Sequence, residues 1–83
     1  MSANAYILVT IEPPRTLDVV KRLRTIPRAM VHEVLGPYDA VVEVEGDTPE
    51  DITQTVRTKI RPIPGVTSTV TCLWMGSPNQ TSG

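Results

Sequence analysis

Aromatic residues are scarce in this sequence, which contains no phenylalanine, one tryptophan and two tyrosines among its 83 residues. The core must therefore be built from Val, Ile and Leu. A chain of this length forms one domain and buries only roughly 60–65% of its unfolded surface, so its stability as a monomer is marginal. We therefore expect the chain to self-associate.

Cysteine and histidine occur once each, as Cys72 and His32. A single cysteine can form no disulfide within the chain and no C-x-x-C metal or redox pair, and its apolar strand context places Cys72 in the core. A catalytic histidine needs an orienting group and a nucleophile or a metal, and the sequence offers His32 no such set. No Gly-rich phosphate loop, H-E-x-x-H or G-x-S-x-G motif occurs. We predict no enzymatic activity, no cofactor and no metal site.

An excess of charge of one sign is also absent, because the net charge is -1. The basic residues that do cluster are interpreted as favourable charges at helix C-termini on a solvated face: Arg22, Arg24, Arg57, Lys59 and Arg61. This charge pattern argues against direct binding of nucleic acid. The longest apolar run, Tyr6 to Val9, is far too short to span a membrane, and no signal peptide is recognisable. We expect a soluble cytoplasmic protein with no membrane partner.

One phrase of the sequence occurs twice. Leu23-Arg24-Thr25-Ile26-Pro27 returns as Ile60-Arg61-Pro62-Ile63-Pro64, an offset of 37 positions (60 minus 23), with Val19 matching Val56 and Arg22 matching Lys59. Each copy closes a helix-like stretch that lies between two strand-like runs. Ile-Pro is also a common stop after a basic helix end, so the match alone leaves coincidence open. Two β-α-β halves predict an α+β, ferredoxin-like βαββαβ domain.

Alternating apolar residues predict four strands, at residues 5–12, 29–35, 38–45 and 66–75. The first is apolar on both faces, which is typical of a central strand covered on both sides. In the third, Ala40, Val42 and Val44 are expected to be buried. In the last, we expect the threonines on one face and the other apolar residues on the opposite face: Thr67, Thr69 and Thr71 against Val66, Val70 and Cys72.

Two helices are predicted from the spacing of apolar residues and from capping signals. In the first, Thr16 is expected to be the N-cap, and the buried stripe is expected to include Leu17, Val20 and Leu23. The second has Asp47 or Thr48 as its N-cap, Pro49 in its first turn and two acids near its positive end. Its buried stripe is expected to be Ile52, Val56 and Ile60.

Right-handed crossovers place the four strands in one antiparallel sheet with both helices on one face. The other face then carries apolar residues such as Leu8 and Val41 with no helix over them, and we expect two copies to pack sheet to sheet there. The domain is expected to span residues 5–75. Residues 76–83 are small and polar, so we expect a disordered tail.

The connection between the second and third strands, Leu35-Gly36-Pro37-Tyr38-Asp39, is the segment best suited to contact a ligand. Gly36 permits close backbone approach, Pro37 stiffens the turn, Tyr38 supplies a flat surface and Asp39 a carboxylate. An ordinary hairpin, in which the aspartate accepts backbone N–H bonds, explains the same residues. The residue chemistry leaves both interpretations open.

Three motifs together resemble the effector-binding (RAM) domain of the Lrp/AsnC regulators, over Ala5 to about Met75. They are Gly36-x-Tyr38-Asp39 between two strands, a helix followed by Ile63-Pro64-Gly65-Val66, and Thr69-x-Thr71 on the last strand. The resemblance implies a domain that dimerises through its sheets, assembles into rings, commonly octamers, and binds amino acids between dimers. The ligand-binding residues that it implies are Leu35, Gly36, Pro37, Tyr38, Asp39, Thr69 and Thr71. Asp39 would pair with the α-ammonium, while Thr hydroxyls and backbone N–H groups receive the α-carboxylate.

The sequence departs from this family in two respects. The regulators carry an N-terminal helix-turn-helix, whereas this sequence starts at the first strand, which implies a stand-alone RAM protein able to modulate full-length regulators through mixed oligomers. Leu35 stands where Thr is frequent, and Pro37 where polar residues are common, which implies a drier pocket or a different ligand.

Two alternatives remain open beside this hypothesis. One is a structural or interaction domain with a vestigial pocket, and the other is a small dimeric α+β-barrel enzyme that uses His32. The ACT domain shares the order of elements, but the Gly36-x-Tyr38-Asp39 hairpin and the terminal Thr-x-Thr argue against it.

Overall fold

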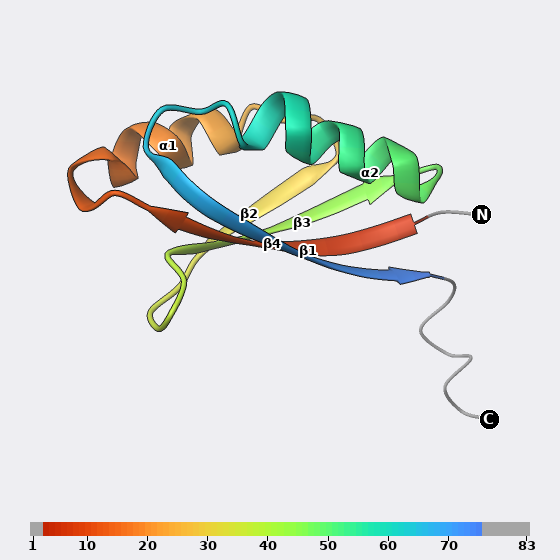
Figure 1. The fold of residues 1–83 in the computed structure, drawn as a ribbon, viewed down its shortest axis with the longest axis horizontal. Helices are drawn as coiled ribbons and strands as arrows, with labels where there is room; N and C mark the ends of the chain where they lie inside the picture. The colour runs from red at the N-terminus through yellow and green to blue at the C-terminus, as the bar shows by residue number, and fades with distance from the viewer. Residues whose placement is uncertain (1–2, 76–83) are drawn as a thin grey trace.

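The computed structural model of the chain describes residues 3–75, which fold into a four-stranded antiparallel sheet with the helices on one face (Figure 1). The elements are β1 (Ala3–Ile11), the 3-10 helix η1 (Pro13–Arg15), α1 (Thr16–Leu23), β2 (Ala29–Glu33), β3 (Ala40–Gly46), α2 (Pro49–Thr55), the π-helix η2 (Val56–Ile60) and β4 (Val66–Met75). The strand order β2-β3-β1-β4 is that of the ferredoxin-like fold. The predicted fold class is therefore confirmed, and the strand ends differ by a few residues.

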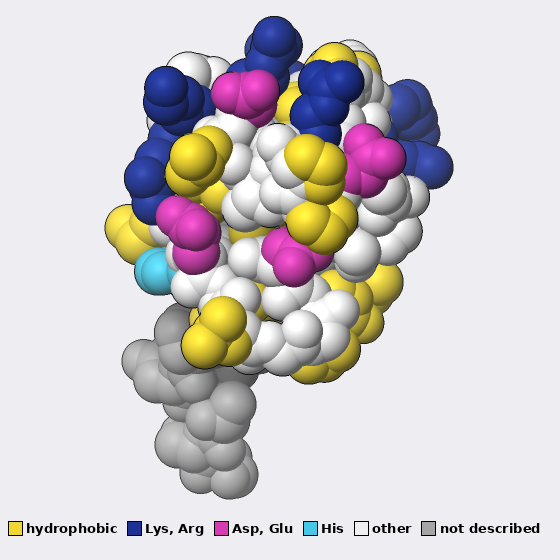
Figure 2. Space-filling view, turned by 90° about the vertical axis from the view of Figure 1, so that its left-hand side faces the viewer, with side chains coloured by type: hydrophobic (Ala, Val, Ile, Leu, Met, Phe, Trp, Pro, Cys, Tyr) yellow, Lys and Arg dark blue, Asp and Glu magenta, His cyan; other side chains and the backbone are white. Residues whose placement is uncertain are grey.

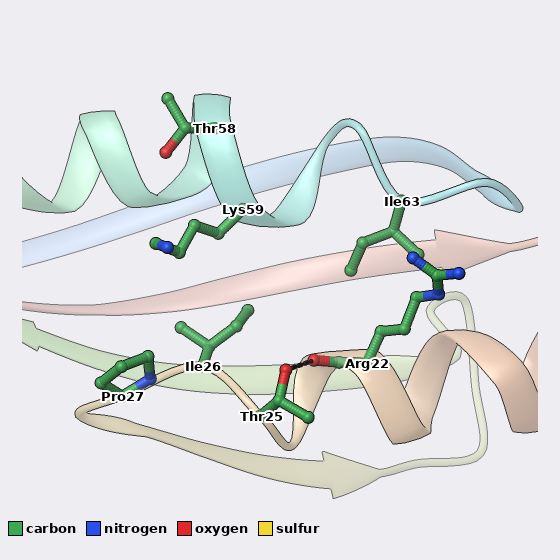
Figure 3. A pocket seen from close by; sticks show the side chains of 7 residues that line it. All are labelled: Arg22, Thr25, Ile26, Pro27, Thr58, Lys59 and Ile63. Carbon is green, nitrogen blue, oxygen red and sulfur yellow. Dashed lines mark hydrogen bonds between the residues drawn. The ribbon is translucent and has the colours of Figure 1, made fainter.

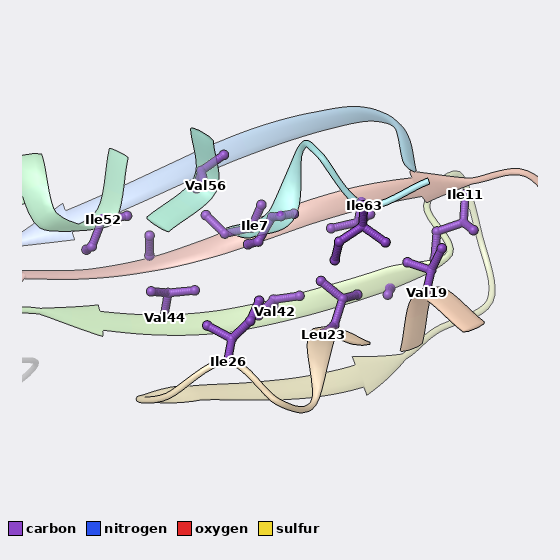
Figure 4. Packing of buried hydrophobic residues seen from close by; sticks show 14 of the residues in the cluster. Ile7, Ile11, Val19, Leu23, Ile26, Val42, Val44, Ile52, Val56 and Ile63 are labelled. Carbon is purple, nitrogen blue, oxygen red and sulfur yellow. The ribbon is translucent and has the colours of Figure 1, made fainter. Parts of the chain in front are cut away.

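The core lies between the sheet and the helices, and strand alternation explains which residues enter it (Figure 4). Every second residue of β1 faces the helices and is buried, from Ala3 to Ile11. As predicted, the core also includes alternate residues of β3 and one stripe of the second helical segment: Ala40, Val42, Val44, Ile52, Val56 and Ile60. β1 is central, as expected, and within this chain the helices cover one of its two faces.

The start of the first helix differs from the prediction. Thr16 is not the N-cap, because Pro13 and Pro14 already open a 3-10 turn, and the Thr16 hydroxyl donates to the Pro13 carbonyl at 3.0 Å. The buried stripe is also shifted: Leu17 is 75% exposed, whereas Val19 is fully buried. The buried stripe of the helix runs through Val19, Val20 and Leu23, and Leu17 lies outside it.

The second helix begins as predicted. Thr48 is its N-cap, and its hydroxyl accepts from the Asp51 amide while the Asp51 carboxylate accepts from the Thr48 amide, which is a complete capping box. The π-helix that follows was not predicted. Its wide turn closes with a hydrogen bond from the Arg61 amide to the Val56 carbonyl at 2.9 Å.

The two copies of the repeated phrase occupy matching places in the structure. Val19 and Val56 are both buried, and Leu23 and Ile60 are both fully buried. The isoleucines that follow each helix, Ile26 and Ile63, are 7% and 8% exposed and enter the same core from opposite sides. Each copy therefore brings a helix end onto the sheet in the same way.

The predicted faces of the last strand were wrong for Val66, because the strand contains a β-bulge. The pairing of β1 with β4 shifts between Thr10 and Ile11, so Ile11 pairs with Val66 while Thr10 pairs with Ser68. One extra residue, Thr67, sits at the bulge and changes the alternation. Val66 therefore packs against the core, whereas Val70 and Cys72 lie on the open face. Cys72 is exposed and is not the core residue that we expected.

The face of the sheet opposite the helices is open in this chain, as predicted. Leu8 and Val41 pair there across β1 and β3, and the same face carries further exposed apolar side chains. Tyr6, Met30 and Val70 are 42%, 60% and 43% exposed. None of the described helices is long and apolar enough to cross a membrane. The predicted tail, 76–83, lies outside the described residues.

Candidate functional site

Asp39 is held at the point where the ladder between β1 and β3 ends. Its amide donates to the Val9 carbonyl at 2.9 Å, its carbonyl accepts from the Val34 amide at 3.2 Å, and its carboxylate oxygen Oδ2 accepts from the Ile11 amide at 2.7 Å. The side chain thus replaces the next strand partner of β1 beyond the Val9–Ala40 pair. The structural role weighed from the sequence, an aspartate accepting a backbone N–H, is present. Within residues 3–75 the second carboxylate oxygen, Oδ1, has no hydrogen-bond partner.

The tip of the hairpin stands clear of the rest of the chain. The loop between β2 and β3 projects from the sheet on the side away from the helices (Figure 1). Leu35 is fully exposed, Pro37 is exposed, and Tyr38 is half-buried. Gly36 has φ +145°, a backbone conformation that favours glycine, and no atom lies within 4 Å of where its Cβ would be. The loop therefore presents an apolar tip and an accessible backbone.

The two threonines lie on β4, on the helix side of the sheet. Thr69 pairs with Val9 and Thr71 with Ile7, and directly paired residues share a face. Both β1 partners are buried under the helices, but β4 is the edge strand beyond them, so Thr69 is half-buried and Thr71 exposed.

Thr69 also lines a pocket of about 310 Å³ at the start of β4, together with Arg61, Val66, Thr67 and Ser68. The sequence interpretation treated Arg61 only as a charge at a helix end, and it missed Ser68. The signal that the sequence offers is the run Thr67-Ser68-Thr69, three hydroxyl residues in succession, which the structure brings beside Arg61 in one pocket.

One copy of the chain brings the predicted ligand-binding residues together only in part. Asp39 and Thr69 flank β1 from its two sides at Val9, so they are separated by two strand spacings, about 10 Å. Leu35, Gly36 and Pro37 lie on the other side of the sheet from the threonine hydroxyls.

The single histidine lies on the open face. His32 Nε2 is 2.9 Å from Glu43 Oε1 across β2 and β3, and both side chains are partly exposed. His32 lies within the strand that was predicted at residues 29–35. Among residues 3–75, no three His, Cys, Asp or Glu side chains lie together as metal ligands would.

Comparison with known proteins gives this geometry a family context. The model of the family described as "Lrp/AsnC ligand binding domain" matches residues 4–83. The chain is also 41% identical over 59 residues to homocitrate synthase from Sulfurisphaera tokodaii, a match that covers 70% of this chain and 13% of the enzyme.

Two solved structures with the same fold are similar to this chain, one over nearly its whole length and the other over about half of its length. The crystal structure of FFRP-DM1 is 31% identical, with a TM-score of 0.81, and the match covers 88% of this chain and 99% of that protein. The transcriptional regulator NMB0573 from Neisseria meningitidis, solved as an L-Met complex, is 15% identical with a TM-score of 0.80. That match covers 92% of this chain but 51% of the regulator, and at this identity it shows a common fold.

Proposed function

Because the chain belongs to the Lrp/AsnC ligand-binding domain family, we propose that it is a small-molecule-binding and oligomerisation module whose ligand is an amino acid. The observation that carries this proposal is the family match over residues 4–83. The L-Met complex of NMB0573, which has the same fold, supports an amino acid as the class of ligand. The proposed role is regulatory and non-enzymatic, in the cytoplasm.

The proposed ligand site lies at the end of β1 and is completed by a neighbouring copy. Asp39 Oδ1 receives the α-ammonium while Oδ2 keeps its bond to the Ile11 amide. The hydroxyls of Thr69 and Thr71 from another copy donate hydrogen bonds to the α-carboxylate. The hairpin tip covers the side chain of the bound amino acid with Leu35, Gly36, Pro37 and Tyr38. A site shared between copies couples ligand binding to assembly, since the ligand favours the state that contains the complete site.

The assembly that we propose has two levels. Two copies pack through their open sheet faces, where Tyr6, Met30 and Val70 would lose their exposed apolar surface. These dimers then join into a ring, with an octamer as the expected form, and the ligand sites lie between dimers. Full-length Lrp/AsnC regulators could enter the same ring, and this chain would then modulate transcription without contacting nucleic acid itself.

The match to homocitrate synthase favours a second candidate, in which the same kind of domain regulates an enzyme rather than a transcription factor. The two candidates differ in the partner that assembles with this chain. Affinity capture of the tagged chain from its own cells, followed by mass spectrometry, separates them. Regulators with a helix-turn-helix support the first candidate, and a synthase subunit supports the second.

The proposed function is tested by measuring solution mass with light scattering, at fixed protein concentration, with and without each standard amino acid. We expect an assembly larger than a dimer, and we expect particular amino acids to change its mass or its melting temperature. A fixed dimer that is indifferent to every amino acid contradicts the ligand proposal and favours a structural role with a vestigial pocket.

A further inference from the structure

A groove lies between the ends of the two helical segments, on the opposite side of the molecule from the hairpin tip. Its volume is about 270 Å³, and its walls come from both halves of the chain (Figure 3). Two pairs of lining residues hold matching positions of the repeated phrase: Arg22 with Lys59, and Ile26 with Ile63. The remaining lining residues are Thr25, Pro27 and Thr58. The internal repeat therefore places one cation and one isoleucine on each wall.

The two cations come from opposite walls of this groove. In Figure 3 the Arg22 side chain extends toward Ile63, whereas the Lys59 side chain runs along the other wall and its charged end points away from Arg22. Seven of the eight Lys and Arg residues lie within the helices or directly beside them, and Figure 2 shows these side chains gathered over the helix layer. The groove thus lies within the most basic part of the surface.

Neither cation is engaged within the described part of the chain. The ion pairs among residues 3–75 are formed by Arg24, Arg28 and His32, and neither Arg22 nor Lys59 takes part in one. The role expected from the sequence, favourable charge at the helix C-termini, requires no direct bond from either side chain. The hydrogen bonds at the two helix ends come from other groups. The Arg22 carbonyl accepts from the Thr25 amide and hydroxyl, and the Ile60 carbonyl accepts from the Ile63 amide.

The π-helix adds a second observation. Five residues in a π turn are rare, and such turns occur frequently at functional sites. This turn keeps Val56 and Ile60 in the core while it places Thr58 and Lys59 on the wall of the groove. The π turn therefore forms part of the groove wall, and it is not part of the hairpin.

We infer that this groove binds a small organic dianion with an apolar body. Arg22 and Lys59 each hold one negatively charged oxygen group, Arg22 through two parallel N–H donors. The Thr58 hydroxyl already donates to the Gln54 carbonyl at 2.7 Å, so the charged contacts come from the two cations alone. The apolar body contacts the exposed Pro27 ring and the small exposed edges of Ile26 and Ile63. The volume lies near the lower end of the range for small-molecule sites. The lining of this groove shares no residue with the proposed amino-acid site.

The inference is tested by isothermal titration calorimetry with four probes: phthalate, phenyl phosphate, benzoate and inorganic phosphate. Phthalate is an apolar dicarboxylate and phenyl phosphate an apolar phosphate, so the tighter of the two identifies the oxygen group. Benzoate lacks the second charge and inorganic phosphate lacks the apolar body. We expect at least one of the first two to bind at least about fivefold tighter than both of the others, and salt to weaken its binding.

A pair of matched variants assigns the binding to the groove. We expect Arg22→Gln with Lys59→Gln to weaken the best probe at least about tenfold. Lys21→Gln with Arg57→Gln removes the same charge from the same two helical segments, outside the groove, and we expect less than about a twofold effect. All four side chains are exposed, and melting curves check that both variants fold.

Three results overturn the inference. Absence of binding by all four probes removes the site, and equal weakening in the two double variants reduces it to a general attraction of charge. Probe-induced chemical shifts in methyl spectra that bypass Ile26 and Ile63 place binding elsewhere. We expect the Arg22→Gln, Lys59→Gln double variant to keep its light-scattering response to amino acids. The experiment therefore distinguishes loss of anion binding in the groove from loss of amino-acid binding at the hairpin.

Discussion

Two glycines of this fold have positive φ angles, but they differ in how closely other atoms surround them. Gly65 has φ +106°, and its carbonyl accepts from the Glu12 amide at 2.8 Å. A Cβ at this position would lie 2.6 Å from Arg15 Cβ and 2.9 Å from Val19 Cγ2. Gly36 also has a positive φ, but its Cβ would meet open space. The first glycine is thus required by its neighbours as well as by its own backbone.

Gly65→Ala is expected to lower the free energy of unfolding by more than Gly36→Ala. Both substitutions strain the backbone by about 1–3 kcal/mol. Gly65→Ala adds an overpacking cost of about 1–3 kcal/mol against α1, because backbone and Cβ atoms must move. Urea unfolding of the two variants measures the difference. Equal losses would mean that the turn at Gly65 shifts freely and that close packing there is unimportant.

Asp39 combines a structural bond with its proposed ligand bond, so two substitutions are needed to separate them. Asp39→Ala removes the acceptor of the Ile11 amide and is expected to cost about 2 kcal/mol of stability. Asp39→Asn keeps an oxygen acceptor but loses the charge, so we expect nearly normal urea unfolding and a lost amino-acid response in light scattering. A response that survives in Asp39→Asn would place the α-ammonium elsewhere.

At the scale of elements, capping controls where each helix begins. The second helix has a reciprocal capping box, whereas the first follows a 3-10 turn and has no side-chain cap. The first helix therefore depends on burial of Val19, Val20 and Leu23 for its position. The second has a local start signal of its own, which explains why its first residue was predictable.

Thr48→Ala is expected to lower the free energy of unfolding by about 1 kcal/mol, because the Asp51 amide loses its acceptor. For a domain of this size that corresponds to a fall of about 5 °C in melting temperature. Thr53→Ala is the control, since the Thr53 hydroxyl only donates back to the Pro49 carbonyl of its own helix. Thermal unfolding of both variants tests the cap, and equal melting temperatures would contradict it.

At the scale of the whole molecule, the two faces differ in chemistry. The helix layer carries most of the basic side chains, while the open sheet face carries exposed apolar side chains with the His32–Glu43 pair at one edge strand (Figure 2). A small core leaves such an apolar face as the natural surface for a second copy. The assembly that we propose and the anion binding that we infer therefore use opposite faces.

Leu8→Arg is expected to break the proposed sheet-to-sheet dimer, because a buried unpaired charge at the centre of the open face opposes association. Leu17→Arg introduces the same charge on an exposed leucine of the helix layer and should leave the dimer intact. Sedimentation velocity of both variants reports the change in mass. A dimer that persists in folded Leu8→Arg would locate the interface on another surface.

Local patterns in the sequence determined the order of elements, the alternation of buried residues in β1 and β3, and the start of α2, because each depends on neighbours within a few positions. Three features were decided only by the tertiary structure. They are the bulge that places Val66 against the core, the exposure of Leu17 and Cys72, and the hydrogen bond from the Ile11 amide to the Asp39 carboxylate. These features depend on the register between segments distant in the chain, which no local period encodes. The candidate site was predicted as a set of residues, but the sheet divides that set between its two sides, which is why the proposed site includes residues of a neighbouring copy.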